Sequence, residues 1–236
     1  SGIKTPALVT NLNDYYAQPC AETVVAGIMA LYRGIDRFSV LKNDARWIGY
    51  PMRAGLQLLM HKKVIILGSG NIARQAAKIL GGFDCDITFF ARTAPDAALR
   101  TAEQLAAALP EADIVIGCLP GTAQTRGLFT TAMIHKMKPS ALFCNIGRGN
   151  LLEDEGALVD ALMNKKIGGA VLDVTAKEPL PENHPLWKCA NTILSQHTGG
   201  GNITEQEGIA HFFLDNLTSF KKGHALKNVI QLEKGY

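Results

Sequence analysis

The chain has 236 residues, 47% of them hydrophobic, which is enough to bury a sizeable core. Its 24 lysines and arginines nearly balance its 21 aspartates and glutamates, and the net charge of +3 offers no electrostatic attraction for nucleic acid or an anionic membrane. No apolar run approaches the roughly 18 residues of a membrane span, and no signal peptide opens the chain, so we expect no membrane partner.

The cysteines are typical of a reducing compartment. They are scattered along the chain without a CxxC pair, and several lie in apolar, strand-like runs. Their odd number and this placement predict reduced, mostly buried thiols in a cytoplasmic protein. No paired Cys/His spacing occurs, so no metal site is predicted. The five are Cys20, Cys85, Cys118, Cys144 and Cys189.

Helical patterns and apolar runs follow one another in chain order. Residues 21–38, introduced by Pro19, predict a long amphipathic helix. Short apolar runs then predict six strands, at 63–68, 85–90, 113–120, 140–147, 168–174 and 191–198. Helices are expected between them at 71–80, 101–109, 131–137 and 154–166, and a last helix is expected at 202–223.

Strands that are apolar throughout and separated by helices predict a parallel sheet with both faces covered. This is a doubly wound, Rossmann-like α/β fold, in which ligands bind beyond the carboxyl ends of the strands. The helices at 21–38 and 202–223 fall outside the alternation. Polar side chains just past the strand ends are therefore the first candidates for a functional site.

The first predicted strand leads into a glycine-rich turn, Gly68-x-Gly70-x-x-Ala73, and then into a helix. Gly68 permits the tight turn, Gly70 lets the backbone approach a pyrophosphate, and Ala73 is small enough for the helix to pack on the strand. The pyrophosphate would lie at the helix N-terminus. Glycines often make turns without binding anything, but the strand before and the helix after predict dinucleotide binding.

The end of the second predicted strand bears on the choice between NAD and NADP. NAD-binding domains place an acid there for the ribose 2′-hydroxyl, but this chain has Ala91 and Arg92, and its next acid is Asp96. Because an arginine suits a 2′-phosphate, NADP is favoured over NAD. The alternative is a solvated arginine at a strand end.

Three polar residues follow successive strands of the predicted sheet: Arg148, Glu178 and His197. An arginine fork can clamp a carboxylate, and a histidine can give or take the proton of a carbinol oxygen. A neighbouring glutamate would orient the imidazole and favour its protonated form. Beside a nicotinamide, such a trio predicts hydride transfer between a 2-oxo acid and a 2-hydroxy acid.

Each member of the trio also has a simpler interpretation. Glu178 could be a solvated loop charge, His197 could cap a strand end, and Arg148 could pair with an acid at 153–155. The occurrence of all three at strand ends of one dinucleotide fold favours the catalytic interpretation. The remaining histidines are assigned to the surface or to packing: His61, His135, His184, His211 and His224.

With these motifs together, the sequence resembles the D-isomer-specific 2-hydroxyacid dehydrogenases. The matching stretches are GSGNIA, DIVIGCLPGTAQTRGLF, MKPSALFCNIGRGNLLEDEGALVDAL, GGAVLDVTAKEPLPENHPLW, ILSQHTGG and the closing LKNVIQLEKGY, in order over nearly the whole chain. The resemblance implies an NAD(P)-dependent oxidoreductase acting on a small 2-oxo acid or D-2-hydroxy acid of the glyoxylate or hydroxypyruvate type.

The resemblance also implies roles for single residues. Arg148 would clamp the substrate, His197 would be the acid/base with Glu178 as its partner, and Asp173 would bind the nicotinamide carboxamide. With the phosphate loop and the second strand end included, the other residues expected to contact the cofactor are Gly68, Ser69, Gly70, Asn71, Ile72, Arg92, Thr93, Cys118, Leu119, Pro120, Thr125, Asn145, Ile146, Gly147, Gly199 and Gly200.

By the same resemblance, residues 18–199 form the dinucleotide-binding domain, with 21–38 as its dimerisation helix. Residues 1–17 and 200–236 would be remnants of a substrate-binding domain, most of which the chain is expected to lack, as in a fragment or a natural short form. The helix and the loop through Trp47 would form the arm of a homodimer.

Two alternatives remain open. A nucleotide-sensing, cofactor-dependent dimeric binding protein of the corepressor type would keep the same trio. A cofactor-binding fragment would bind the nucleotide without turnover. Formate dehydrogenase chemistry fits less well, because those relatives usually carry glutamine at the position of Glu178.

Overall fold

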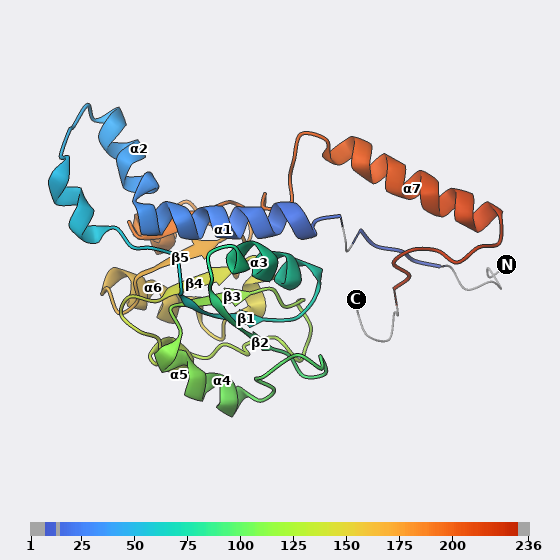
Figure 1. The fold of residues 1–236 in the computed structure, drawn as a ribbon, viewed down its shortest axis with the longest axis horizontal. Coiled ribbons are helices and arrows are strands. Elements are labelled where there is room, and N and C mark those ends of the chain that lie inside the picture. Colours follow the sequence, from blue (N-terminus) through green and yellow to red (C-terminus); the bar gives the residue numbers. More distant parts are fainter. Residues whose placement is uncertain (1–7, 13–14, 231–236) are drawn as a thin grey trace.

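The computed structural model describes residues 8–12 and 15–230. Its centre is a six-stranded sheet in the order β2-β1-β3-β4-β5-β6, and every neighbouring pair is parallel. The predicted doubly wound, Rossmann-like sheet is therefore confirmed (Figure 1). The strands are β1 Lys63–Leu67, β2 Asp86–Phe90, β3 Ile114–Gly117, β4 Leu142–Asn145, β5 Gly169–Leu172 and β6 Thr192–Leu194.

Helices join the strands and flank the sheet. The α-helices are α1 Ala17–Arg33, α2 Ile35–Asn43, α3 Asn71–Gly81, α4 Ala102–Ala108, α5 Thr131–Ile134, α6 Glu155–Met163 and α7 Glu205–Lys221. Short 3₁₀ helices occupy Tyr50–Gly55, Leu109–Glu111, Gly149–Leu151 and Pro185–Lys188. None of the helices in the described ranges is long and apolar enough to cross a membrane.

The core has two layers, one on each face of the sheet. Because side chains alternate along a strand, Val64 and Ile66 of β1 face α1 and α3, whereas Ile65 and Leu67 face α4, α5 and α6. All four side chains are at most 4% exposed. Figure 1 shows α1 and α3 stacked over one face and α4 and α5 below the other. This burial on both faces explains why the strands read as continuous apolar runs.

The predicted single helix at 21–38 is wrong, because the chain turns at Gly34. Gly34 adopts φ +66°, a left-handed conformation that glycine tolerates and that ends α1. The helix also begins earlier than predicted, at Ala17, so that Pro19 falls in its first turn. A proline is tolerated there because first-turn N–H groups have no helical partner. The chain continues in α2, which extends away from the sheet (Figure 1).

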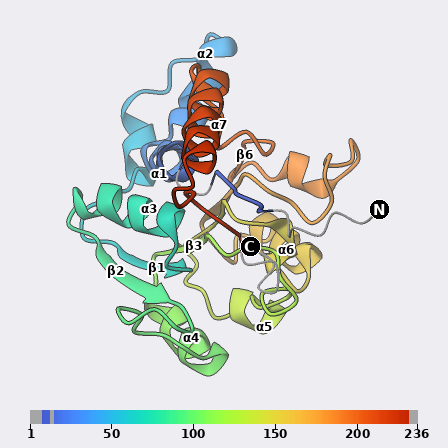
Figure 2. The ribbon, with the colours of Figure 1, turned by 90° about the vertical axis from the view of Figure 1, so that its right-hand side faces the viewer.

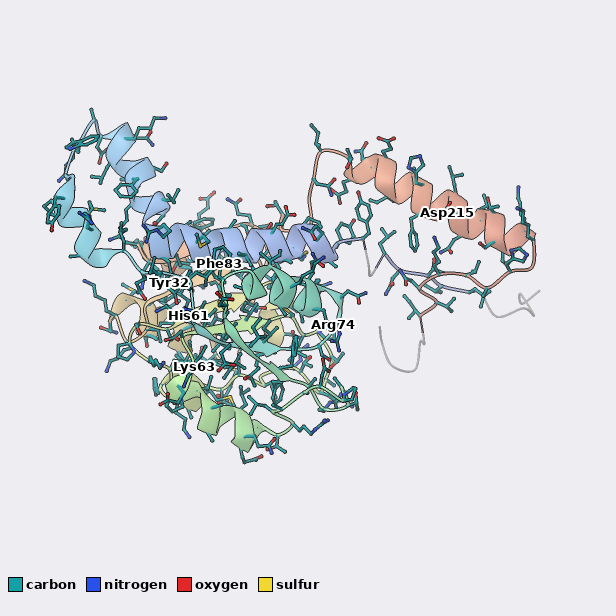
Figure 3. All side chains as sticks on the ribbon, viewed as in Figure 1. Tyr32, His61, Lys63, Arg74, Phe83 and Asp215 are labelled. Carbon is teal, nitrogen blue, oxygen red and sulfur yellow. The ribbon has the colours of Figure 1, made fainter. Side chains whose placement is uncertain are left out.

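Helix α7 lies apart from the sheet and is joined to the rest through two tyrosines. Tyr15 donates to the backbone oxygens of Thr204 and Glu205, and Tyr16 donates to the Glu205 carboxylate at 3.0 Å. Figure 1 shows α7 projecting beyond the end of α1, and Figure 2, viewed from that side, shows α7 in front of α1. Asp215 marks its outer part in Figure 3.

The two described ends of the chain pair with each other beneath α7. Thr10 and Val229 form an antiparallel bridge, and the amide of Ile230 donates to Val9 at 2.8 Å. The amide of Asn11 donates to the Asn228 carbonyl at 3.1 Å. The predicted remnants at 1–17 and 200–236 lie partly outside the described residues, and their assignment to a second domain stays a prediction.

Candidate active site

The phosphate loop has the geometry that the glycine pattern predicts. Gly68 follows β1 with φ +111°, and Gly70 caps the N-terminus of α3. A Cβ added at Gly70 would meet no atom within 4 Å, so the space above it is open. Ala73 is fully buried where α3 packs on the sheet. The N–H groups and the dipole at the start of α3 therefore face an open space that suits an anion.

A cleft of about 720 Å³ runs along the carboxyl ends of the strands. This volume falls within the roughly 300–1,000 Å³ typical of small-molecule and cofactor sites. It brings together most of the residues expected to bind the cofactor, and the Arg148 side chain reaches it too. The expected residues in its wall are Gly68, Ser69, Gly70, Asn71, Ile72, Arg92, Thr93, Cys118, Leu119, Pro120, Thr125, Ile146 and Gly147.

Four other expected cofactor residues are not among those that line the cleft: Asn145, Asp173, Gly199 and Gly200. Asn145 is 1% exposed, accepts from the amide of Gly147 at 3.1 Å and donates to the Arg148 carbonyl at 3.0 Å. It shapes the loop after β4. The polar end of β4 is therefore part of the local scaffold that carries Arg148.

The second strand end holds an arginine in the cleft, as the sequence predicts. Arg92 donates from Nη2 to Oε1 of Gln124 at 2.6 Å. The next acid along the chain, Asp96, forms a bidentate ion pair with Arg74 of α3. Nη1 of Arg74 donates to Oδ2 of Asp96 at 2.8 Å, and Nη2 donates to Oδ1 at 3.2 Å. Figure 3 places Arg74 near the end of the sheet opposite to Lys63, the first residue of β1. No carboxylate therefore stands unpaired at this end of the cleft in the described chain.

Glu178 and His197 meet, although they are 19 positions apart along the sequence. Oε2 of Glu178 lies 2.6 Å from Nδ1 of His197, and Oε1 accepts from the amide of Thr175 at 3.0 Å. Burial raises the pKa of Glu178, but the hydrogen bonds from His197 and Thr175 outweigh it, and the net pKa lies below its ordinary value. Glu178 is thus an ionised partner that orients the imidazole.

The loop that carries His197 is fastened by Asp173, which is 6% exposed at the end of β5. Its Oδ1 accepts from the Ser195 hydroxyl at 2.6 Å and from the amides of Thr198 and Gly199 at 3.0 and 2.9 Å. The amide of His197 donates to the Asp173 carbonyl at 2.6 Å. Because of this anchoring, His197 holds φ +56°, an uncommon conformation for a residue with a side chain.

Arg148 is exposed and forms no ion pair within the described ranges. The three nearby acids are occupied: Glu153 accepts from the Thr131 amide, Asp154 caps α6, and Glu155 binds the Ala176 amide and His184. The proposed pairing of Arg148 with residues 153–155 is therefore wrong. The Arg148 charge is one of the causes of the lowered pKa of Glu178.

Several residues of the site were missed at the level of sequence. Gln124 was not singled out, because a glutamine in a loop carries no motif of its own. Asn11 and residues 228–230 line the cleft only because the two chain ends fold back together. His184 was assigned to the surface or to packing, and in the structure its Nε2 lies 3.4 Å from the largely buried carboxylate of Glu155.

All five cysteines are free, as predicted. Burial raises the pKa of Cys20 to about 11 and that of Cys118 to about 12, so neither is a thiolate near neutral pH. Within the described residues, no group of histidine, cysteine and acidic side chains is arranged to hold a metal ion. The thiols therefore act here as small apolar groups.

The fold agrees with what sequence comparison shows. A family profile described as "D-isomer specific 2-hydroxyacid dehydrogenase, NAD binding domain" matches residues 25–199. The chain belongs to this family. It is accordingly an oxidoreductase with a nicotinamide dinucleotide-binding domain.

Named relatives cover most of this chain. A probable 2-ketogluconate reductase from Dictyostelium discoideum is 35% identical over 79% of this chain and 55% of its own length. A glyoxylate reductase from Pyrococcus horikoshii is 30% identical over 95% of this chain and 70% of its own. A glyoxylate/hydroxypyruvate reductase B from Salmonella newport is 33% identical over 96% of this chain and 69% of its own length.

Solved structures share the fold over nearly the whole chain. The TT0316 protein from Thermus thermophilus matches with a TM-score of 0.84 and 29% identity, over 95% of this chain and 71% of that one. A D-isomer specific 2-hydroxyacid dehydrogenase from Xanthobacter autotrophicus Py2, in complex with NADPH and MES, matches with a TM-score of 0.81 and 27% identity. The match covers 100% of this chain and 97% of that one.

Proposed function

We propose that the chain transfers a hydride between NADPH and a small 2-oxo acid of the glyoxylate or hydroxypyruvate type, giving the D-2-hydroxy acid. The observation that carries this proposal is the 2.6 Å contact between Glu178 and His197. A carboxylate–imidazole pair at the carboxyl edge of a dinucleotide-binding sheet is suited to proton transfer beside a nicotinamide.

The residues present fit a dinucleotide. The pyrophosphate would lie on the N–H groups at the start of α3, above Gly70, where the structure leaves space. Oδ1 of Asp173 accepts hydrogen bonds from the loop 195–199, and its second oxygen, Oδ2, would take the amino group of the carboxamide. When bound, the cofactor supplies the hydride that reaches the carbonyl carbon.

The chain's own residues would then handle the carboxylate and the proton. Arg148, with no competing ion pair in the described chain, would clamp the substrate carboxylate through its guanidinium fork. Because Nδ1 of His197 faces Glu178, Nε2 is the nitrogen left to donate a proton to the carbonyl oxygen. Glu178 would hold the ring in place and stabilise its charged form.

Arg92 supports the preference for NADPH over NADH. It stands where an NAD-binding domain would place an acid, and Asp96 is neutralised by Arg74. The names of the relatives add support for the substrate class, since two of them are reductases of glyoxylate or of glyoxylate and hydroxypyruvate. A homodimer through α1 and the arm that follows it, formed by α2 and the 3₁₀ helix Tyr50–Gly55, also belongs to the proposal.

The test is oxidation of NADPH and NADH by the 236-residue chain with glyoxylate and hydroxypyruvate, alongside cofactor binding followed by fluorescence. We expect NADPH-dependent turnover that falls at least about 100-fold in His197→Ala and Arg148→Ala, in line with the usual contribution of a general acid. His135→Ala, which changes an exposed histidine at the end of α5 that does not line the cleft, is the control.

The other outcomes are equally informative. Tight cofactor binding without turnover would replace the enzyme by a cofactor-binding fragment or a nucleotide-sensing protein. Failure to bind either cofactor would contradict the proposed function altogether.

A further inference from the structure

The hydrogen bond between Arg92 and Gln124 joins two sides of the cofactor cleft. Arg92 follows β2, and Gln124 lies in the loop after β3. Strand β1 lies between those two strands in the sheet, and its end carries the phosphate loop. Both side chains line the cleft. The contact therefore joins two walls over the loop that begins at Gly68.

Both walls are fixed independently of this contact. The Arg92 carbonyl accepts from Nη1 of Arg100 at 3.2 Å, and the Pro95 carbonyl accepts from Nη2 of Arg100 at 3.4 Å. On the other wall, Oγ1 of Thr125 accepts from the amide of Thr122 at 2.9 Å. With the backbone held on both sides, the main remaining freedom of Arg92 is in its long side chain. Gln124 removes that freedom.

The type of residue at 124 matters as much as its position. A guanidinium has five N–H donors, and an amide oxygen occupies one of them without changing the charge. The donors left over can meet an anion in the cleft. A carboxylate at the same place would pair with Arg92, cancel its charge and repel a phosphate.

We propose that Gln124 is a positioning residue that sets the cofactor preference: it holds Arg92 across the cleft with its charge and remaining donors directed at the 2′-phosphate of NADPH. This inference rests on the proposed function. It assigns to Gln124 a share in the discrimination between NADPH and NADH, whereas the pyrophosphate and nicotinamide contacts serve both cofactors equally.

The experiment is a fluorescence titration of the full chain with NADPH and with NADH. Gln124→Glu is expected to weaken NADPH binding at least tenfold and NADH binding less than threefold, so that the ratio of the two Kd values shifts at least threefold toward NADH. Gln124→Met, which keeps the length but loses the acceptor, is expected to shift the ratio in the same direction by a smaller factor. Raising the salt concentration should weaken NADPH binding less in Gln124→Glu than in the wild type.

Gln206→Glu, an exposed glutamine on α7, is the matched control and should leave both Kd values unchanged. If Gln124→Glu and Gln124→Met weakened the binding of NADPH and NADH by the same factor, the positioning role would be overturned and the proposed function would remain intact. The positioning role would also be overturned if the preference for NADPH over NADH were lost in Arg92→Ala but kept in Gln124→Glu and Gln124→Met. A wild-type chain without preference would also overturn it, and one that binds neither cofactor would overturn the proposed function with it.

Discussion

At the scale of single residues, the site depends on one buried carboxylate. Asp173 receives three hydrogen bonds on one oxygen, and its carbonyl receives a fourth from His197. An unpaired buried donor costs about 1–3 kcal/mol, so these contacts hold the loop firmly. His197 can therefore keep a left-handed backbone conformation and present its ring to Glu178. The proposed catalytic pair is thus positioned by neighbouring residues.

Glu178 makes the stability of the fold depend on pH in a defined direction. In the folded chain its pKa lies below the ordinary value of 4.5, because the hydrogen bonds from His197 and Thr175 outweigh burial. The unfolded chain therefore binds a proton more readily as the pH falls. The stabilisation by ionised Glu178 is present above about pH 5 and is lost as the pH falls through the folded pKa.

We predict that Glu178→Gln lowers the free energy of unfolding at pH 7 and that its difference from the wild type shrinks toward pH 3.5. Urea midpoints at pH 7, 5, 4 and 3.5 would measure it. Glu182→Gln, which changes an exposed carboxylate in the same loop, is the control. A difference that stays constant over this range would contradict the role assigned to the Glu178 carboxylate.

At the scale of elements, the candidate functional residues lie just beyond the carboxyl ends of the strands. The predicted strands at 113–120 and 191–198 end early, as β3 Ile114–Gly117 and β6 Thr192–Leu194. The residues beyond them no longer pair with a neighbouring strand but turn to form the cleft wall and the His197 loop. Helix α3 begins at the same edge, so its N-terminal N–H groups share the cleft with those turns.

Gly70 gives a prediction at this scale. Because its added Cβ would meet nothing in the free protein, we predict that Gly70→Ala leaves the free energy of unfolding within about 0.5 kcal/mol of the wild type. The same methyl group would occupy the space assigned to the pyrophosphate, so the Kd for NADPH should rise at least about tenfold, or 1.4 kcal/mol. Chemical denaturation and fluorescence titration measure the two effects.

Gly81→Ala, at the exposed end of α3, is the matched control. Its Cβ also meets nothing within 4 Å, and we expect stability to rise by about 0.5–1 kcal/mol with cofactor binding unchanged. Wild-type affinity in Gly70→Ala would show that the pyrophosphate does not lie above this loop.

At the scale of the whole molecule, two parts project from the sheet: α7 at one end and the arm formed by α2 and the 3₁₀ helix Tyr50–Gly55 at the other (Figure 1). The arm carries Trp47, 96% exposed, and Tyr50, 77% exposed. Large aromatic side chains are enriched at protein interfaces and costly to leave in water. The arm is therefore the part of this chain best suited to the proposed homodimer.

We predict that the chain is a dimer at micromolar concentration and that Trp47→Ser raises the dimer Kd at least about tenfold, because a buried tryptophan commonly contributes about 2 kcal/mol or more to an interface. Light scattering coupled to size-exclusion chromatography would measure the mass. Phe220→Ser, which changes an exposed aromatic on α7, is the control. A monomeric wild type would contradict the dimer.

The sequence alone predicted the parallel sheet, which the structure confirms, and singled out the phosphate loop and the three residues Arg148, Glu178 and His197, whose roles stay predictions. Apolar runs, glycine spacing and polar side chains at strand ends are local signals, and they report local structure directly. A local signal also existed for the break of the long helix, since Gly34 lies within 21–38, but a glycine inside an amphipathic pattern is often accommodated by the helix.

Only the tertiary structure decided how those residues are supported. The anchoring of the His197 loop by Asp173, the pairing of Asp96 with Arg74, and the crossing of the cleft from Arg92 to Gln124 join segments that are 22 to 32 residues apart. The closure of the cleft by Asn11 and residues 228–230 joins the two ends of the described chain. Such contacts depend on how the sheet brings loops together, and no periodicity or motif in one segment carries that information.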